Sequence, residues 1–220
     1  MSARSIRVWD LPVRLTHWAL VLCIAGLYAT GEFGWLTMQW HFWFGYGALA
    51  LVLFRILWGL VGSEHARFAD FVRGPRAILA YLQGGAPTIG HNPLGALAVL
   101  AMLALVLAQA VSGLFSNDEI EWFGPLSERI SVAASADWTD WHHLGQKLLL
   151  GLIVLHLLAI AGYKLVRRVD LVTPMLGGRK LHADGVDAQW RSPWLALVLF
   201  LVCAAAVAAV AGWGPLPAAY

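Results

Sequence analysis

Five long apolar runs dominate the sequence. They lie at residues 11–30, 40–61, 93–115, 138–166 and 193–212. Each reaches the ~20 residues that an α-helix needs to cross the hydrocarbon core of a bilayer. The lipid offers no partners for backbone N–H and C=O groups, so only helices and closed barrels can span it. Runs of this length favour helices, and we predict an all-α integral membrane protein with five transmembrane spans.

Composition supports a membrane protein. Hydrophobic residues make up 60% of the chain and charged residues only 13%, whereas a soluble domain has about 25% charged residues. Cys23 and Cys203 lie inside apolar runs, where a free cysteine usually acts as a small hydrophobe. No cleavage site follows the first run, so we interpret it as a retained span. We expect the lipid bilayer, and no nucleic acid, as a partner.

Basic and acidic residues are segregated along the chain. With five spans, three basic segments share one side, which the positive-inside rule assigns to the cytoplasm. The connection at residues 116–140 lies on the other side and holds six acidic residues against Arg129. We therefore expect a cytoplasmic N-terminus and a C-terminus on the outer side of the membrane. The basic residues concerned are Arg4, Arg7, Arg14, Arg67, Arg73, Arg76, Lys164, Arg167, Arg168, Arg179, Lys180 and Arg191.

The fourth run carries two histidines on one face of the expected helix. His142 and His156 are 14 positions apart, within about 40° of four whole turns and about 21 Å along the axis. The hydrocarbon core is about 30 Å thick, so one imidazole lies near each side of the membrane. An ionisable residue inside a span is costly and is a functional candidate for that reason. His143 points about 140° away from the face of His156.

Two further histidines match these depths from other spans. His17 lies near the cytoplasmic start of the first run, at the depth of His156, and His41 near the outer start of the second, at the depth of His142. Paired imidazoles at two depths predict two bis-histidine haems b, whose potentials depend on the axial ligands and the surrounding dielectric. No CxxCH motif is present, which argues against covalently attached haem.

The second run adds a candidate for binding the haem propionates. Gly45 and Ala48 share a helix face with His41 and leave room for a porphyrin. Arg55 follows His41 by 14 positions, on the same face and at the depth of the inner pair. A buried guanidinium needs an anion, so we predict that Arg55 binds a haem propionate.

Other interpretations of these residues stay open. Each histidine alone is as consistent with a hydrogen-bonded structural residue as with a ligand. Zinc fits less well, because the sequence lacks HExxH and CxxC motifs. His65, His91 and His182 fall in cytoplasmic segments, where solvated side chains are expected. Lys147 is expected to extend toward the interface or to pair with a propionate.

Three stretches carry a family resemblance. The sequence VWDLPVRLTHW at 8–18, with LWGLVGSEHARF at 57–68 and GHNPLG at 90–95, resembles the bacterial cytochrome b561 family, whose superfamily includes the b-type subunits of nickel–iron hydrogenases. The resemblance covers residues 5–180 and implies a four-helix core with two haems b. Carried over by position, the iron ligands are His17, His41, His142 and His156. Residues 181–220 would be a linker and a fifth transmembrane helix, a departure from the four-span pattern.

The resemblance implies electron transfer across the inner membrane. The expected route joins a periplasmic redox protein, such as a c-type cytochrome, to the quinone pool, either ubiquinone or menaquinone. The acidic outer connection suits docking of a basic partner, and the quinone is expected near the inner haem, close to Arg14, His17 and His91. The chain would then be the electron-transfer component of an oxidoreductase chain.

Two alternatives remain. One is a self-contained superoxide:quinone oxidoreductase, in which the positive charge of Lys147 attracts the anion. The other is a metal-ion transporter or a membrane anchor. Transporters usually show broken spans or repeated halves, and neither is evident here.

Overall fold

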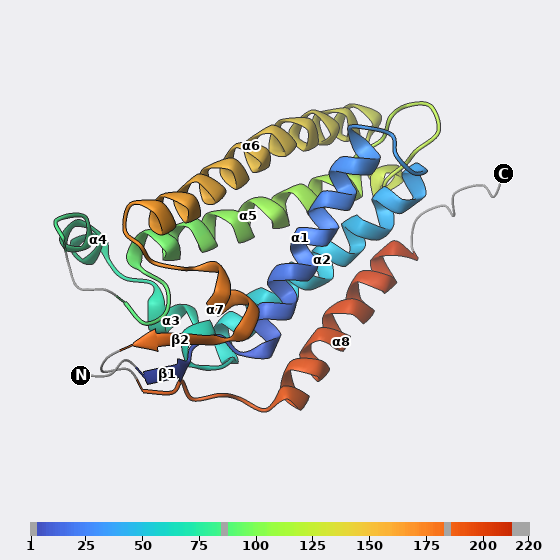
Figure 1. Ribbon diagram of the computed structural model, residues 1–220. Coiled ribbons are helices and arrows are strands. Elements are labelled where there is room, and N and C mark those ends of the chain that lie inside the picture. Colours follow the sequence, from blue (N-terminus) through green and yellow to red (C-terminus); the bar gives the residue numbers. More distant parts are fainter. Residues whose placement is uncertain (1–3, 85–87, 183–185, 213–220) are drawn as a thin grey trace.

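Five long helices form the body of the protein. The computed structural model describes residues 4–84, 88–182 and 186–212. Each long helix is long and apolar enough to cross a membrane, which confirms the all-α membrane fold. Figure 1 shows them as an elongated bundle: α1 (Leu11–Gly31), α2 (Met38–Val61), α5 (Pro93–Phe115), α6 (Val132–Leu165) and α8 (Pro193–Ala211).

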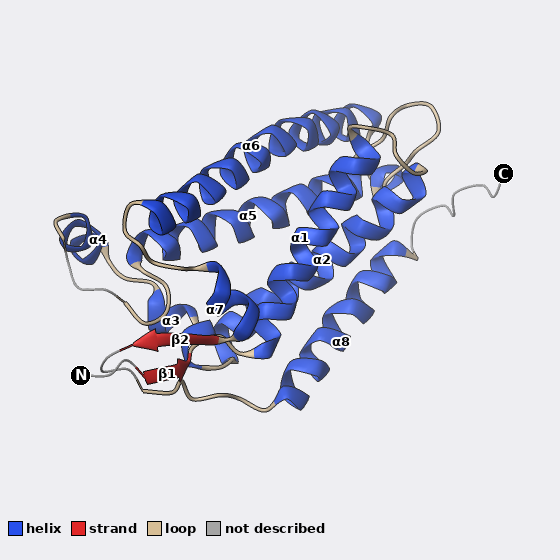
Figure 2. Ribbon diagram, in the orientation of Figure 1, coloured by secondary structure: helices blue, strands red, loops and turns tan. Residues whose placement is uncertain are grey.

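Short elements gather mainly at one end of the bundle (Figure 2). Strand β1 pairs antiparallel with β2, with Arg4 opposite His182 and Arg7 opposite Arg179. The sequence did not predict this strand pair. The short elements are β1 (Arg4–Arg7), η1 (Glu64–Ala66), α3 (Phe68–Phe71), α4 (Pro75–Leu82), η2 (Ser127–Arg129), α7 (Val172–Gly177) and β2 (Arg179–His182).

Polar side chains fix where several helices begin. Asp10 accepts a hydrogen bond from the N–H of Val13 at 2.9 Å, and Asn92 accepts one from Gly95 at 2.8 Å. Such caps satisfy backbone donors that the first turn leaves free. Ser131 caps α6 in the same way. Helix α6 therefore begins at Val132, six residues before the start of the predicted span at 138, because hydropathy detects only the part that enters the lipid.

Helix α2 is the centre of the packing. It packs closely against α1, α5 and α8, and α5 packs in turn against α6. Val52 and Trp58 of α2 are fully buried. On α8, Ala196, Cys203 and Val207 are buried, so the fifth helix covers one side of α2. Among the described helices, α1 and α6 do not pack closely against each other. Residues of both helices border the candidate site.

We name the two ends of the bundle by their charge. The basic end contains β1, β2, η1, α3, α4 and α7. The acidic end contains the connection from α5 to α6, residues 116–131. Figure 1 places these ends at opposite extremes of the long helices. The basic segments of the sequence thus share one side of the bundle, as the five-span arrangement requires.

Candidate functional site

Near the acidic end, two histidines from different helices face each other. The imidazole rings of His41 on α2 and His142 on α6 have centroids 6.3 Å apart and are inclined by 72°. The structure thus brings together the two residues that the sequence analysis paired by depth. Tyr28 on α1 also joins this region to α6, because its hydroxyl donates to the carbonyl oxygen of Gln146 at 2.6 Å.

Hydrogen bonds to Nδ1 orient both rings. The hydroxyl of Thr30 lies 2.7 Å from the carbonyl oxygen of Gly26, to which it donates, and 3.1 Å from Nδ1 of His41. The hydroxyl oxygen is then free to accept from Nδ1–H. Nδ1 of His142 lies 3.0 Å from the carbonyl oxygen of Gln109 and 3.0 Å from the hydroxyl of Ser112. Placing the proton on Nδ1 leaves each Nε2 with its lone pair, which is the form that binds a metal.

Two glycines allow the backbone to approach these rings. A Cβ added at Gly31 would lie 2.9 Å from Cε1 of His41, and one at Gly113 would lie 3.0 Å from Cε1 of His142. Real Cβ atoms rarely come this close, so both positions favour glycine. The glycines and the hydrogen bonds together fix the positions of the imidazoles.

The second pair lies toward the basic end. His17 on α1 and His156 on α6 are close enough for their charges to interact. The ring of His17 contacts Trp18 edge-on, with centroids 5.0 Å apart. Nδ1 of His17 is buried and has no hydrogen-bond partner among the described residues. A buried polar atom of this kind needs a ligand or a water molecule.

The acidic-end pair fits a bis-histidine haem. A metal–imidazole bond is about 2 Å long and a ring nitrogen lies about 1 Å from its centroid, so two imidazoles on one iron have centroids roughly 6 Å apart. The observed 6.3 Å agrees with this value. Three or more ligands of the His, Cys, Asp or Glu type, as a structural zinc site needs, are not clustered anywhere in the described chain.

Arg55 lies in a buried polar cluster near the basic end. Its side chain is 6% exposed. One guanidinium nitrogen donates to the carbonyl oxygen of Ala66 at 3.2 Å, and the guanidinium lies 5.5 Å from the ring centroid of Phe68. The carboxylate of Asp10 acts on it electrostatically. We expected the buried guanidinium of Arg55 to need an anion, and the carboxylate of Asp10 is an anion within the chain that acts on it.

Sequence reasoning missed the role of Asp10. Besides capping α1, its carboxylate accepts a hydrogen bond from the indole N–H of the fully buried Trp58 at 2.9 Å. It also missed Thr30, Gln109 and Ser112, which hold the acidic-end imidazoles. No spacing in the sequence relates Thr30 to His41 or Ser112 to His142, because these contacts depend on how the helices pack.

Two histidines that were expected to be solvated instead meet at the basic end. The ring of His91 lies between Trp9 at 4.6 Å and Phe71 at 4.4 Å, and His65 lies 6.5 Å from Trp9. Burial, followed by the charges of Arg55 and His65, lowers the pKa of His91 to about 3. Nδ1 of His91 and Nε of Arg14 are both buried and have no partner among the described residues.

The acidic end carries an ordered connection. Oδ1 of Asp118 accepts hydrogen bonds from the N–H groups of Ile120, Glu121 and Trp122. Although partial burial raises the pKa of Asp118, these bonds hold it below its usual value. The six acidic side chains of residues 116–140 are all exposed. This end therefore presents a fixed negative surface.

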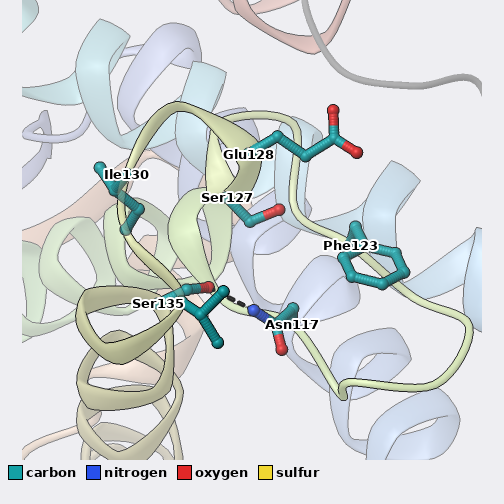
Figure 3. Close-up of a pocket in the computed structure, with 7 residues that line it drawn as sticks. Asn117, Phe123, Ser127, Glu128, Ile130 and Ser135 are labelled. Atoms are coloured by element: carbon teal, nitrogen blue, oxygen red, sulfur yellow. Dashed lines mark hydrogen bonds between the residues drawn. The ribbon is translucent and has the colours of Figure 1, made fainter.

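A shallow pocket of about 290 Å³ opens beside this connection (Figure 3). On its inner side, the amide of Asn117 donates to the hydroxyl of Ser135 at 2.5 Å. Figure 3 shows Glu128 and Phe123 pointing away from this hydrogen bond, on the outer side of the loop. The other residues that line the pocket are Ser127, Ile130 and Val132.

The remaining polar candidates near the acidic end, His143 and Lys147, are exposed.

Comparison with known proteins gives one consistent family. The model of the prokaryotic cytochrome b561 family matches residues 8–178. A probable Ni/Fe-hydrogenase B-type cytochrome subunit of Azotobacter chroococcum is 27% identical over 82% of this chain and 90% of its own length. The corresponding subunit of Cupriavidus necator is 25% identical, covering 83% of this chain and 90% of that protein. In Escherichia coli, the probable Ni/Fe-hydrogenase 1 B-type cytochrome subunit is 23% identical, covering 81% and 92%.

No solved structure matched the chain. The family model covers α1, α2, α5 and α6 and ends before α8. The matched region includes all four histidines that the sequence analysis selected. The five apolar helices, the fit of the histidine pair and the family match lead to one conclusion: the chain belongs to the prokaryotic cytochrome b561 family and is a membrane b-type cytochrome that transfers electrons.

Proposed function

We propose that this protein carries electrons across the bacterial inner membrane through two haems b. His41 and His142 would hold the haem near the acidic end, and His17 and His156 the haem near the basic end. The arrangement of His41 and His142, 6.3 Å apart with both Nδ1 atoms hydrogen-bonded, carries the proposal. Haem b, when bound, supplies one-electron redox chemistry; the chain supplies ligation, orientation and a dry surrounding.

The positions of the four histidines define the proposed path of electron transfer. His142 and His156 lie on one helix, about 21 Å apart along its axis. His142 faces His41 of α2, and His156 interacts electrostatically with His17 of α1, so in this proposal the two sites would be stacked across the membrane. Arg55, buried toward the basic end, is the cation that we propose for a propionate of the inner haem, in addition to its contact with Asp10.

We assign the basic end to the cytoplasm by the positive-inside rule. The acidic end then faces the periplasm, where its exposed carboxylates would attract a basic redox protein. The names of the relatives favour a nickel–iron hydrogenase as the redox partner, and a c-type cytochrome is the alternative. An association rate that falls steeply with ionic strength would support docking at the acidic end.

We place the exchange of electrons with the quinone pool at the basic end. Nε of Arg14 and Nδ1 of His91 are buried there without partners among the described residues, and a quinone carbonyl oxygen could accept from such a donor. The proposal predicts that a quinone analogue binds the wild type and binds more weakly to Arg14→Gln and His91→Leu variants. Unchanged binding of the analogue in both variants would contradict a quinone site at this position.

A pyridine haemochrome titration and a reduced-minus-oxidised spectrum test the core of the proposal. The purified protein should contain two haems b per chain. His41→Ala and His142→Ala should each remove the same haem, and His17→Ala and His156→Ala should each remove the other. His143→Ala, an exposed neighbour of His142, is the matched control and should keep both. One haem per chain, or loss of both haems in every variant, would contradict the two-site arrangement.

A further inference from the structure

Helix α4 stands apart from the haem-bearing helices. It packs against α5 and connects to α6 through a side-chain hydrogen bond. The hydroxyl of Tyr81 on α4 lies 2.7 Å from the hydroxyl of Tyr163 on α6, which also accepts a hydrogen bond from the amide of Asn92 at 3.0 Å. Tyr163 is in the last turn of α6. These contacts hold α4 level with the end of a membrane-spanning helix.

One face of α4 is apolar and only partly covered. Ile78 and Tyr81 are half-buried against the bundle, whereas Leu79 is 58% exposed and Leu82 is 60% exposed. Ala80, almost opposite Leu82 around the helix, is also exposed. An amphipathic helix with this pattern commonly lies in the plane of the membrane surface, with its apolar face toward the acyl chains.

Exposed apolar residues also lie at the end of α6, close in sequence to Tyr163. Leu165 and Val166 at that end are 78% and 81% exposed. A pair of tyrosines at this level is typical of the membrane–water interface. We call these exposed side chains of α4 and of the end of α6 the apolar surface of the basic end.

Positive charge surrounds this surface. Arg73, Arg76 and Arg167 are exposed, and Arg167 is near enough to act electrostatically on Tyr81. The carboxylate nearest in sequence to Arg73 and Arg76 is that of Asp70, which pairs with Arg67 at 2.7 Å, and Arg73 donates to the backbone carbonyl of Asp70. Asp170, three positions after Arg167, accepts hydrogen bonds from the N–H groups of Val172 and Thr173. Asp70 therefore does not neutralise this group of arginines. Guanidinium groups bind phosphate oxygens through paired hydrogen bonds.

We propose that α4 lies in the membrane–water interface, with Leu79 and Leu82 among the acyl chains and Arg73, Arg76 and Arg167 binding the phosphates of anionic phospholipids. Charge complementarity selects this occupant: anionic lipid offers an acyl region for the leucines and phosphates for the arginines at the same level. The inference rests on the membrane-spanning helices alone and does not depend on the number of haems or on the redox partner.

Spin labels on the two faces of α4 test its position. Leu82→Cys and Ala80→Cys would be made in a Cys23→Ala, Cys203→Ala background and placed in nanodiscs of phosphatidylcholine with about 30% phosphatidylglycerol. The label at position 82 should be several-fold more accessible to oxygen than to a water-soluble nickel chelate, and the label at position 80 should show the reverse. Equal access of the chelate to both labels, or exclusion of both reagents at position 82, would overturn the proposal. The second pattern would indicate a protein contact instead.

Native mass spectrometry tests the lipid headgroup. Wild-type protein should retain phosphatidylglycerol in preference to phosphatidylcholine, and Arg73→Gln/Arg76→Gln should lose most of this preference. Arg4→Gln/Arg191→Gln, which removes the same charge from exposed positions away from α4, is the matched control and should keep it. Equal loss in both double variants would show general charge attraction and contradict a site on α4. An unchanged visible spectrum checks that each variant is folded.

Discussion

Gly113 and His142 meet where α5 passes the candidate haem site: a Cβ added to the glycine would lie 3.0 Å from Cε1 of the imidazole. Nδ1, the ring atom next to Cε1, is held by the carbonyl oxygen of Gln109 and the hydroxyl of Ser112. A larger residue at position 113 must therefore displace either the ring or the helix.

We expect Gly113→Val to lower the occupancy of one haem while the other is retained. The valine methyl groups would push His142 away from the position that allows ligation, and errors of about 1 Å in such sites commonly abolish their function. Haem content per chain and the reduced-minus-oxidised spectrum measure the effect. Gly162→Ala, where a Cβ meets nothing within 4 Å, is the control. Full occupancy in Gly113→Val would show that the imidazole can move without losing its ligand role.

Removing the acceptor of an imidazole N–H should change a haem potential. An N–H···O bond strengthens electron donation by the imidazole and so stabilises ferric iron. We expect Thr30→Val to raise the potential of one haem by tens of millivolts, since a tenfold change in relative affinity for two redox states corresponds to about 59 mV for one electron. Redox titration followed at the α-band measures it. A comparable rise in Thr173→Val, an exposed position at the basic end, would exclude this explanation.

His91 should make the protein sensitive to acid. Burial and the charges of Arg55 and His65 lower its pKa from 6.5 to about 3. Between these values the unfolded chain binds a proton that the folded chain does not, so stability falls as the pH decreases from 6.5 toward 3. His91→Gln should reduce the drop in melting temperature between pH 7 and pH 4.5. The exposed His143→Gln should leave it unchanged, and equal slopes for all three proteins would disprove the assignment.

Asp10 should contribute to stability through two hydrogen bonds. Asp10→Ala removes the cap of α1, at a cost of about 1 kcal/mol, and leaves the buried indole N–H of Trp58 unpaired, at about 1–3 kcal/mol more. We expect a lower melting temperature in detergent for Asp10→Ala. Combining it with Trp58→Phe should add less than the sum of the single changes, because the same hydrogen bond is lost. Strictly additive effects of the two substitutions would mean that the Asp10–Trp58 hydrogen bond does not contribute to the stability of the fold.

The sequence predicted the helices and the proximity of His41 and His142 well, for a physical reason. A membrane span must be a continuous apolar helix, so hydropathy locates α1, α2, α5 and α8 almost to the residue. Depth in the membrane follows directly from position along such a helix. Position alone therefore paired His41 with His142, whose ring centroids lie 6.3 Å apart in the structure.

Contacts between helices and outside the lipid were harder to predict. The bond from Nδ1 of His41 to Thr30 depends on side-chain rotamers of two helices, and no local pattern encodes it. The strands β1 and β2 are only four residues each and lie far apart in the chain. His91 was expected in water because its segment is polar, yet Trp9 and Phe71 enclose it.

The pairing of β1 with β2 also bears on how the chain is assembled. Residues 4–7 are synthesised before the helices that follow them, but their partner at residues 179–182 is made only after the four long helices α1, α2, α5 and α6. The N-terminal segment must therefore wait, unpaired, while the spans enter the membrane one after another. Pairing of β1 with β2 is therefore a late step of biogenesis, which links the segment before α1 to the segment after α6 once both helices are in place.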